Sequence, residues 1–170
     1  MADYDAEKMW EGAVSAKLTS CRADQIWPLL EDFFNFGKCL PGTIDTCYGI
    51  EGISGQPGCI RYCAKTSISD DGSGEMTTIW ANEKLLAIDP DRRCLSYSLQ
   101  ENSIGFKSHM ATIKLLPLGS QEQEGCEVVW SFTLKPIEGQ TIDHIVSLYD
   151  SCIQAMAKHI EDALQVKSNE

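Results

Sequence analysis

The chain has 170 residues, of which 43% are hydrophobic and 23% charged, a composition typical of one globular domain. Lys and Arg number 14 against 25 Asp and Glu, so the net charge is −11, which disfavours contact with nucleic-acid phosphates or anionic lipid. No stretch reaches the ~18 apolar residues needed to cross a bilayer, and the first residues lack a signal peptide's basic and apolar regions. We therefore expect one cytoplasmic domain over 1–170, ordered from about 9 to about 165. Neither nucleic-acid binding nor membrane insertion is expected, and the sequence identifies no protein partner.

Eight cysteines are spread along the chain without a C-x-x-C pair. In a chain of this length without a signal peptide, they favour free thiols over a disulfide framework. Their scatter does not suggest a zinc site, and no phosphate-loop or dinucleotide fingerprint is present. We expect no metal and no cofactor.

The apolar pattern predicts the elements in chain order. A strand at 10–18 is followed by a helix that Thr19 or Ser20 can cap, and by a second short helix near 36–42. Six more strands are predicted near 43–51, 58–66, 74–84, 93–101, 106–117 and 125–135, separated by turns rich in Gly, Pro and Asp. Apolar residues at three- and four-residue steps over 141–164 predict a long amphipathic helix.

This order indicates an α+β fold. Short turns between consecutive strands make the seven-stranded sheet antiparallel, and the sheet must curl around the long helix to bury both apolar faces. The space between a curved sheet and its helix is usually a pocket, so the pattern predicts a fold that holds a ligand. We expect this pocket to be lined by Phe33, Leu40, Cys59, Cys63, Ala81, Tyr97, Phe106, Trp130, Tyr149, Cys152 and Met156.

Strand alternation places three polar side chains on the inner face: Arg61, Glu83 and His109. A buried charge without a partner costs several kcal/mol, so Arg61 and Glu83 should pair with each other or with a ligand. A structural ion pair at the sheet edge and a hydrogen-bonded core histidine are the alternatives. Because three titratable groups share one predicted cavity, the pattern favours a proton-transfer site.

Several sequence blocks carry a resemblance to a known family. They are MWEG at 9–12, WPLLEDF at 27–33, GCIRY at 58–62, WANEKL at 80–85, LSYS at 95–98, WSF at 130–132 and IEG at 137–139. With their spacing, the chain resembles the plant polyketide cyclase/dehydrase and lipid transport superfamily, which includes the birch pollen allergen and START domains. Within it, the chain is most similar to lachrymatory factor synthase-like proteins. The resemblance implies the helix-grip fold over nearly the whole chain.

The resemblance also implies a chemistry. In lachrymatory factor synthases, the arginine of the GCIRY block binds a sulfenic acid oxygen and the glutamate of the WANEKL block moves a proton to carbon. These are Arg61 and Glu83 here. A third family residue, a tyrosine, is His109 in this chain, and a pocket tryptophan of the last helix is Cys152.

Two functions follow from these expectations. One is a cofactor-independent enzyme, an isomerase, cyclase or lyase of a small plant metabolite, with Arg61 binding an oxyanion, Glu83 carrying the proton and His109 as second acid or base. The other is a non-catalytic protein that binds or transports an apolar, lipid-like metabolite held through Arg61.

Overall fold

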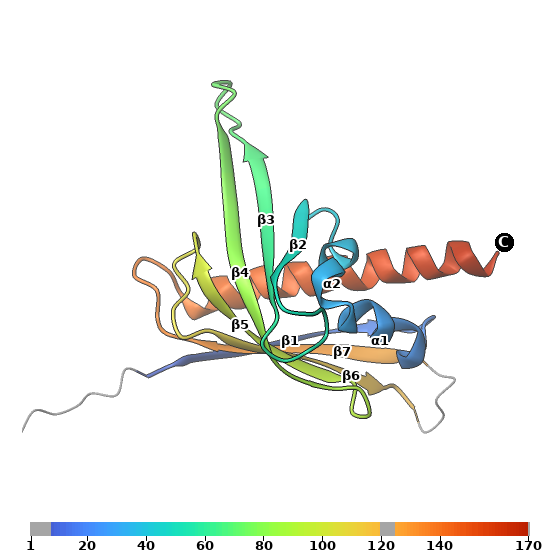
Figure 1. Ribbon diagram of the computed structural model, residues 1–170. Coiled ribbons are helices and arrows are strands. Elements are labelled where there is room, and N and C mark those ends of the chain that lie inside the picture. Colours follow the sequence, from blue (N-terminus) through green and yellow to red (C-terminus); the bar gives the residue numbers. More distant parts are fainter. Residues whose placement is uncertain (1–7, 120–124, 170) are drawn as a thin grey trace, which may run out of the picture.

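The structure is a computed structural model that describes residues 8–119 and 125–169. The elements in chain order are β1 (Trp10–Leu18), α1 (Ala23–Glu31), the 3-10 helix η1 (Phe33–Cys39), β2 (Thr46–Glu51), β3 (Ile60–Ile68), β4 (Met76–Asp89), β5 (Cys94–Asn102), β6 (Met110–Pro117), β7 (Cys126–Leu134) and α2 (Ile142–Ser168) (Figure 1). The α+β class predicted from the sequence is confirmed. None of the described helices is long and apolar enough to cross a membrane.

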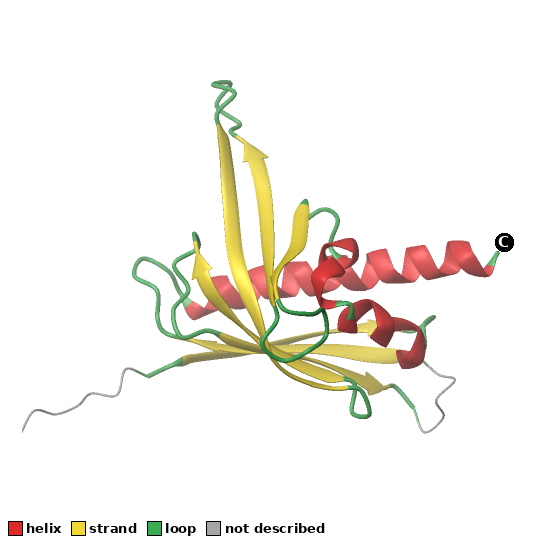
Figure 2. Ribbon diagram, in the orientation of Figure 1, coloured by secondary structure: helices red, strands yellow, loops and turns green. Residues whose placement is uncertain are grey.

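All seven strands form one antiparallel sheet in the order β1-β7-β6-β5-β4-β3-β2. β1 and β2 follow each other in the chain but lie at opposite edges, because α1 and η1 carry the chain from one edge to the other (Figure 2). The chain then returns strand by strand until β7 pairs with β1 along its whole length.

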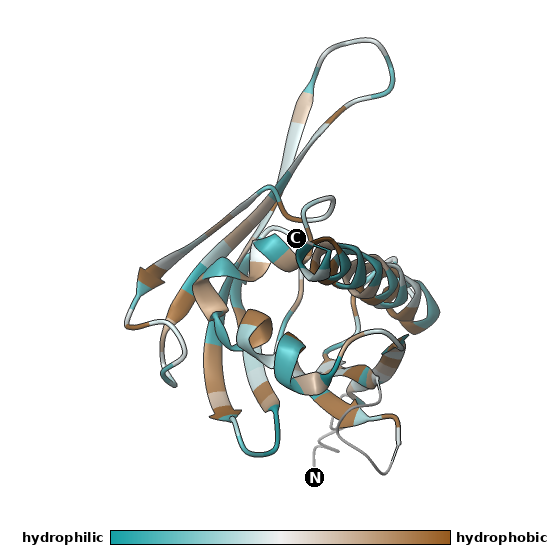
Figure 3. Cartoon of the chain, turned by 90° about the vertical axis from the view of Figure 1, so that its right-hand side faces the viewer, coloured by the Kyte–Doolittle hydropathy of each residue, from teal (hydrophilic) through white to brown (hydrophobic). Residues whose placement is uncertain are grey.

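The apolar sides of the sheet and of α2 face each other. Every second residue of β7 from Cys126 to Leu134 is buried. The buried residues of α2 recur mostly at three- and four-residue steps and are Ile145, Tyr149, Ile153, Met156, Ala157 and Ile160. In Figure 3, which looks along α2, the sheet curves around this helix, α1 and η1. This is the helix-grip arrangement that the sequence predicts.

The largest differences from the predicted strand boundaries are at the end of β4 and at the start of β6. β4 continues to Asp89 instead of ending at 84, and together with β3 it forms a hairpin that projects beyond the rest of the sheet (Figure 1). β6 begins at Met110 instead of 106, because the side chain of Asn102 closes a turn before it. Asn102 Oδ1 accepts hydrogen bonds from the backbone N–H groups of 104, 105 and 106, and its Nδ2 donates to the Phe106 carbonyl.

Candidate functional site

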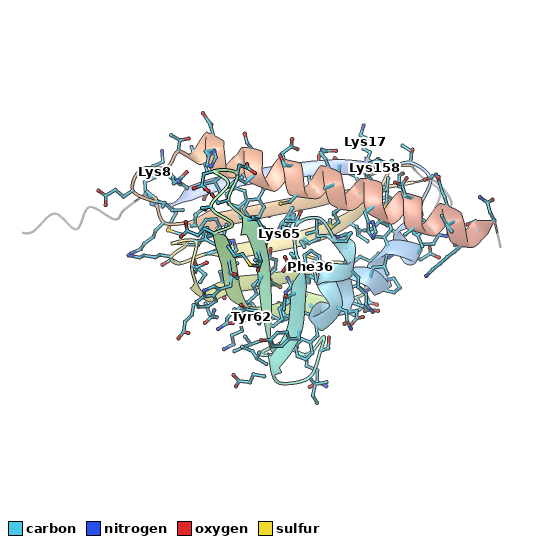
Figure 4. All side chains as sticks on the ribbon, turned by 90° about the horizontal axis from the view of Figure 1, so that it is seen from above. Lys8, Lys17, Phe36, Tyr62, Lys65 and Lys158 are labelled. Carbon is cyan, nitrogen blue, oxygen red and sulfur yellow. The ribbon has the colours of Figure 1, made fainter. Side chains whose placement is uncertain are left out.

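Arg61 and Glu83 form an ion pair on the inner face of the sheet. They are directly opposite in the β3–β4 register, and Glu83 Oε2 accepts from Arg61 Nε at 2.7 Å and lies 2.6 Å from Nη2. Arg61 is 1% exposed, and the Glu83 side chain is 14% exposed. Tyr62, the next residue in β3, lies on the opposite face, away from α2 (Figure 4). The contact predicted by strand alternation is therefore present.

The 3-10 helix η1 completes the surroundings of the guanidinium. Arg61 Nη1 donates to the Phe33 carbonyl at 2.9 Å, and the Arg61 carbon Cζ lies 3.9 Å from the Phe33 ring centroid and 4.5 Å from that of Phe36. Asn35, between the two phenylalanines, has non-helical dihedrals (φ −109°, ψ 17°), and across this kink both rings reach the same cation. Burial is the largest single effect and disfavours the charge, but Glu83 together with Cys63, Tyr97 and Cys47 outweighs it, and the pKa of Arg61 is raised.

Glu83 is held by one carboxylate oxygen only. Every hydrogen bond to its side chain in the described part of the chain ends on Oε2, and Oε1 is not among the fully buried unpartnered atoms. Oε1 is therefore not fully buried. The β4–β5 register shifts on both sides of Glu83, between Ala81 and Glu83 and between Leu85 and Ala87. Such bulges change the direction in which a side chain points.

His109 is engaged at both ring nitrogens. It precedes β6, is 3% exposed, and accepts the Leu99 backbone N–H on Nδ1 at 3.2 Å. Because that amide can only donate, the proton of the neutral ring is on Nε2, which donates to Tyr149 Oη at 2.7 Å. Burial lowers the pKa of His109 to about 4, so the imidazole is neutral at pH 7.

Two buried phenols lie beside these groups. Tyr149 Oη accepts from His109, and Tyr97 Oη accepts from Trp130 Nε1 at 3.1 Å. Burial, with the charge of Glu83 as a further cause, raises the pKa of both phenols, so both stay protonated. Each hydroxyl accepts one bond and keeps its own proton available to donate.

Tyr97 connects the two halves of the predicted site. Its ring centroid is 5.3 Å from Cζ of Arg61 and 6.0 Å from the centroid of the His109 ring. No hydrogen bond or ion pair between described residues joins His109 to Arg61 or Glu83 directly. The three predicted residues therefore share one cluster through Tyr97.

The predicted lining residues lie in the core. Phe33, Leu40, Cys59, Cys63, Ala81, Tyr97, Trp130, Tyr149 and Met156 are buried, and Phe106 and Cys152 are partly buried. Rings of Phe33, Phe36 and Tyr97 pack around the guanidinium of Arg61. Four hollows of 420–530 Å³ open at other places on the surface, and none of them is lined by Arg61, Glu83 or His109.

Sequence reasoning missed two residues of the site. Phe36 could have been found from its three-residue spacing to Phe33, had the short helix been recognised as a 3-10 helix. Cys47 lies opposite Cys63 in the β2–β3 register, with the sulfurs 3.5 Å apart. The described residues contain no group of three or more His, Cys, Asp or Glu side chains able to hold a metal ion.

Comparison with known proteins agrees with this architecture. The structure is similar to ginseng major latex-like protein 151 from Panax ginseng (TM-score 0.67, 19% identity, covering 91% of this chain and 97% of that one). It is also similar to a protein of Nitrosospira multiformis (0.68, 18%, 88% and 95%) and to XoxI from Bacillus cereus (0.66, 19%, 90% and 94%). Residues 9–161 match the family described as polyketide cyclase / dehydrase and lipid transport. The chain belongs to this family.

Proposed function

We propose that the chain is a cofactor-independent enzyme that binds a small metabolite and catalyses a proton-transfer isomerisation, cyclisation or elimination. The observation that supports this most is the state of Glu83, whose Oε2 is fixed by Arg61 while Oε1 has no partner in the described part of the chain. A carboxylate with a fixed orientation and one free oxygen can take a proton from a substrate and return it elsewhere. Arg61 acts as a positioning residue, since its Nε and Nη2 contact Glu83 Oε2 and its Nη1 donates to the Phe33 carbonyl.

Tyr97 and Tyr149 supply the hydrogen-bond donors. When a substrate loses a proton, negative charge develops on it, and O–H donors held in place beforehand stabilise that charge. In the lachrymatory factor synthase-like proteins that the sequence resembles, a phenol stands at the position of His109. Here the Nε2–H of His109 holds the hydroxyl of Tyr149, so a phenol from α2 takes that place. We assign His109 this positioning role instead of the second acid or base expected from the sequence.

The resemblance suggests an alkenyl sulfenic acid as substrate class. Its oxygen would accept from the phenols, and its carbon would receive the proton carried by Glu83. The eight free thiols support a reducing, cytoplasmic location.

The test is turnover of an alkenyl sulfenic acid released in situ, with the product measured by gas chromatography and mass spectrometry. Glu83→Gln can still accept from Arg61 but cannot carry a proton, so we expect kcat to fall roughly 10²–10⁴-fold. Tyr149→Phe should lower it by roughly 10²-fold. Glu101→Gln, at an exposed position of β5, is the matched control and should leave turnover unchanged. Wild-type turnover that persists in Glu83→Gln would contradict the mechanism.

A binding protein for an apolar metabolite is the second candidate. It is favoured by the packing of Arg61, which lies between two rings with its Nε, Nη1 and Nη2 each in contact with a protein oxygen. The fluorescent probe 8-anilinonaphthalene-1-sulfonate distinguishes the two. Equal probe affinity in wild type and Glu83→Gln, with no turnover in either, would identify a binding protein.

A further inference from the structure

Two thiols face each other across the edge of the sheet. Cys47 of β2 and Cys63 of β3 are direct register partners, and their Sγ atoms are 3.5 Å apart. A disulfide bond is about 2.05 Å long, so the sulfurs need to approach by roughly 1.5 Å. β2 is the edge strand and is paired on one side only, so it can move toward β3 without breaking a second ladder.

The two thiols differ in access. Cys47 is half-buried and lines a hollow of about 430 Å³ together with Gly37 and Lys38. Cys63 is 6% exposed and lies on the inner side, with its sulfur 3.9 Å from Glu83 Oε2. A small oxidant can therefore reach Cys47 first, and Cys63 is in place to react with the oxidised sulfur.

The surroundings of Cys47 also favour its thiolate. The Cys63 thiol and the Gly37 backbone N–H donate to its sulfur and, with the charge of Arg61, lower the pKa of Cys47 to about 6, against the opposing effects of burial and of Glu83. The Phe34 carbonyl, 3.3 Å from the sulfur, accepts from the protonated thiol and also opposes ionisation. The contact with Cys47 and burial raise the pKa of Cys63, so Cys47 is the thiol that ionises first. The other charged groups facing it are Lys38 and Asp45, which line the hollow.

We propose that Cys47 and Cys63 are a redox pair, in which a hydroperoxide oxidises Cys47 and Cys63 then forms a cross-strand disulfide with it. In the first step the Cys47 thiolate attacks one peroxide oxygen, the O–O bond breaks, and hydroxide leaves, which gives a sulfenic acid. In the second step the Cys63 sulfur attacks the Cys47 sulfur, the S–O bond breaks, and the Cys63 proton and the leaving hydroxide form water. With hydrogen peroxide, two thiols are oxidised by two electrons and the peroxide is reduced to two waters.

The disulfide acts on the ion pair at the inner face. Its formation removes the Cys63 thiol proton next to Glu83 Oε2 and rotates the sulfur toward β2. Oxidation of the two thiols at the edge of the sheet therefore changes the surroundings of the Glu83 carboxylate that Arg61 holds. The redox pair itself does not depend on the proposed enzymatic function.

The experiment treats the reduced full-length chain with hydrogen peroxide at pH 7, blocks the remaining thiols by alkylation, and maps peptides by mass spectrometry. We expect a peptide linked through Cys47 and Cys63, with the other six cysteines alkylated. In Cys63→Ser the reaction should end at a sulfenic acid on Cys47, which dimedone traps. Cys47→Ser should not form the linkage. Cys94→Ser, at a half-buried cysteine in β5, is the control and should form the linkage as wild type does.

The pH dependence gives a second readout on the wild-type chain, which does not rely on any variant folding. With a pKa of about 6, the thiolate fraction of Cys47 falls about tenfold between pH 7 and pH 5, and the initial oxidation rate should fall equally. Alkylation of all eight cysteines after peroxide treatment would overturn the proposal. So would a disulfide between other residues, or an unchanged rate at pH 5.

Discussion

Replacing Arg61 by Met tests how much of the stability depends on the buried ion pair. Met reproduces the Arg61 side chain only as far as about Nε, so the substitution removes the guanidinium carbon that lies against the rings of Phe33 and Phe36. It also removes both contacts to Glu83 Oε2 and the bond to the Phe33 carbonyl. The measured loss therefore combines removal of the cation with the space left between the rings.

The magnitude follows from what is left behind. A mostly buried carboxylate without its partner typically costs about 3–5 kcal/mol of the free energy of unfolding. For a domain of this size, that corresponds to a fall in Tm of roughly 6–20 °C. Arg61→Met combined with Glu83→Leu should regain at least about half of the loss, because no charge is then left unpaired.

Urea denaturation followed by tryptophan fluorescence measures both variants. Arg92→Met is the matched control: Arg92 is 83% exposed, its Nε lies 3.8 Å from Asp89, and its loss should cost less than about 1 kcal/mol. If Arg61→Met lies within about 1 kcal/mol of wild type, or if the double variant is no more stable than the single one, this account of the pair is wrong.

Three further predictions concern the surroundings of the site. Burial places the folded pKa of His109 near 4, below the unfolded value near 6.5, so the unfolded chain binds the proton first as the pH falls. The free energy of unfolding should therefore fall by about 3 kcal/mol between pH 6.5 and pH 4. Urea titrations should show this pH dependence in wild type and not in His109→Gln. Gly49→Ala should cost about 1–3 kcal/mol of the free energy of unfolding, because the new Cβ would overlap the Phe34 ring. Adding Phe34→Ala to this variant should recover part of the loss. Equal stability of Gly49→Ala and wild type would contradict the close contact between Gly49 and Phe34. Trp130→Phe should cost about 1 kcal/mol through the lost hydrogen bond to Tyr97 Oη. In a double-mutant cycle, the variant that combines Trp130→Phe with Tyr97→Phe should lose less stability than the sum of the two single variants. Strict additivity would refute the coupling.

The fold was predictable because burial alternates along β7 and along most of β1, β5 and β6. The strand at 10–18 has its predicted bounds, and the helix predicted over 141–164 extends from Ile142 to Ser168. The same alternation placed Arg61 and Glu83 on one face, and the register of two neighbouring strands brought them together.

The other contacts of the site depend on geometry that alternation does not encode. Phe36 reaches Arg61 across a kink at Asn35 inside η1, and Cys47 meets Cys63 only in one β2–β3 register. His109 faces inward as predicted, but it precedes β6 and follows Ser108, whose φ of 50° lies in the left-handed region. A two-residue period carries no information about such a turn.

The surroundings of Arg61 bear on where an anionic substrate oxygen can bind. Three of the five guanidinium N–H groups face protein oxygens, and the residue is 1% exposed with the rings of Phe33 and Phe36 against it. An oxygen that replaced Glu83 or the Phe33 carbonyl would leave that acceptor without its donor. The hydroxyls of Tyr97 and Tyr149 can donate without breaking any existing bond, since each only accepts in the described structure. In the proposed mechanism, the roles therefore divide between positioning by Arg61 and charge stabilisation by the phenols. On this division, loss of a phenol hydroxyl should lower turnover and cost about 1–3 kcal/mol of the free energy of unfolding, since the buried N–H of Trp130 or His109 then lacks its acceptor. Loss of Arg61 should lower turnover as well and cost more, about 3–5 kcal/mol.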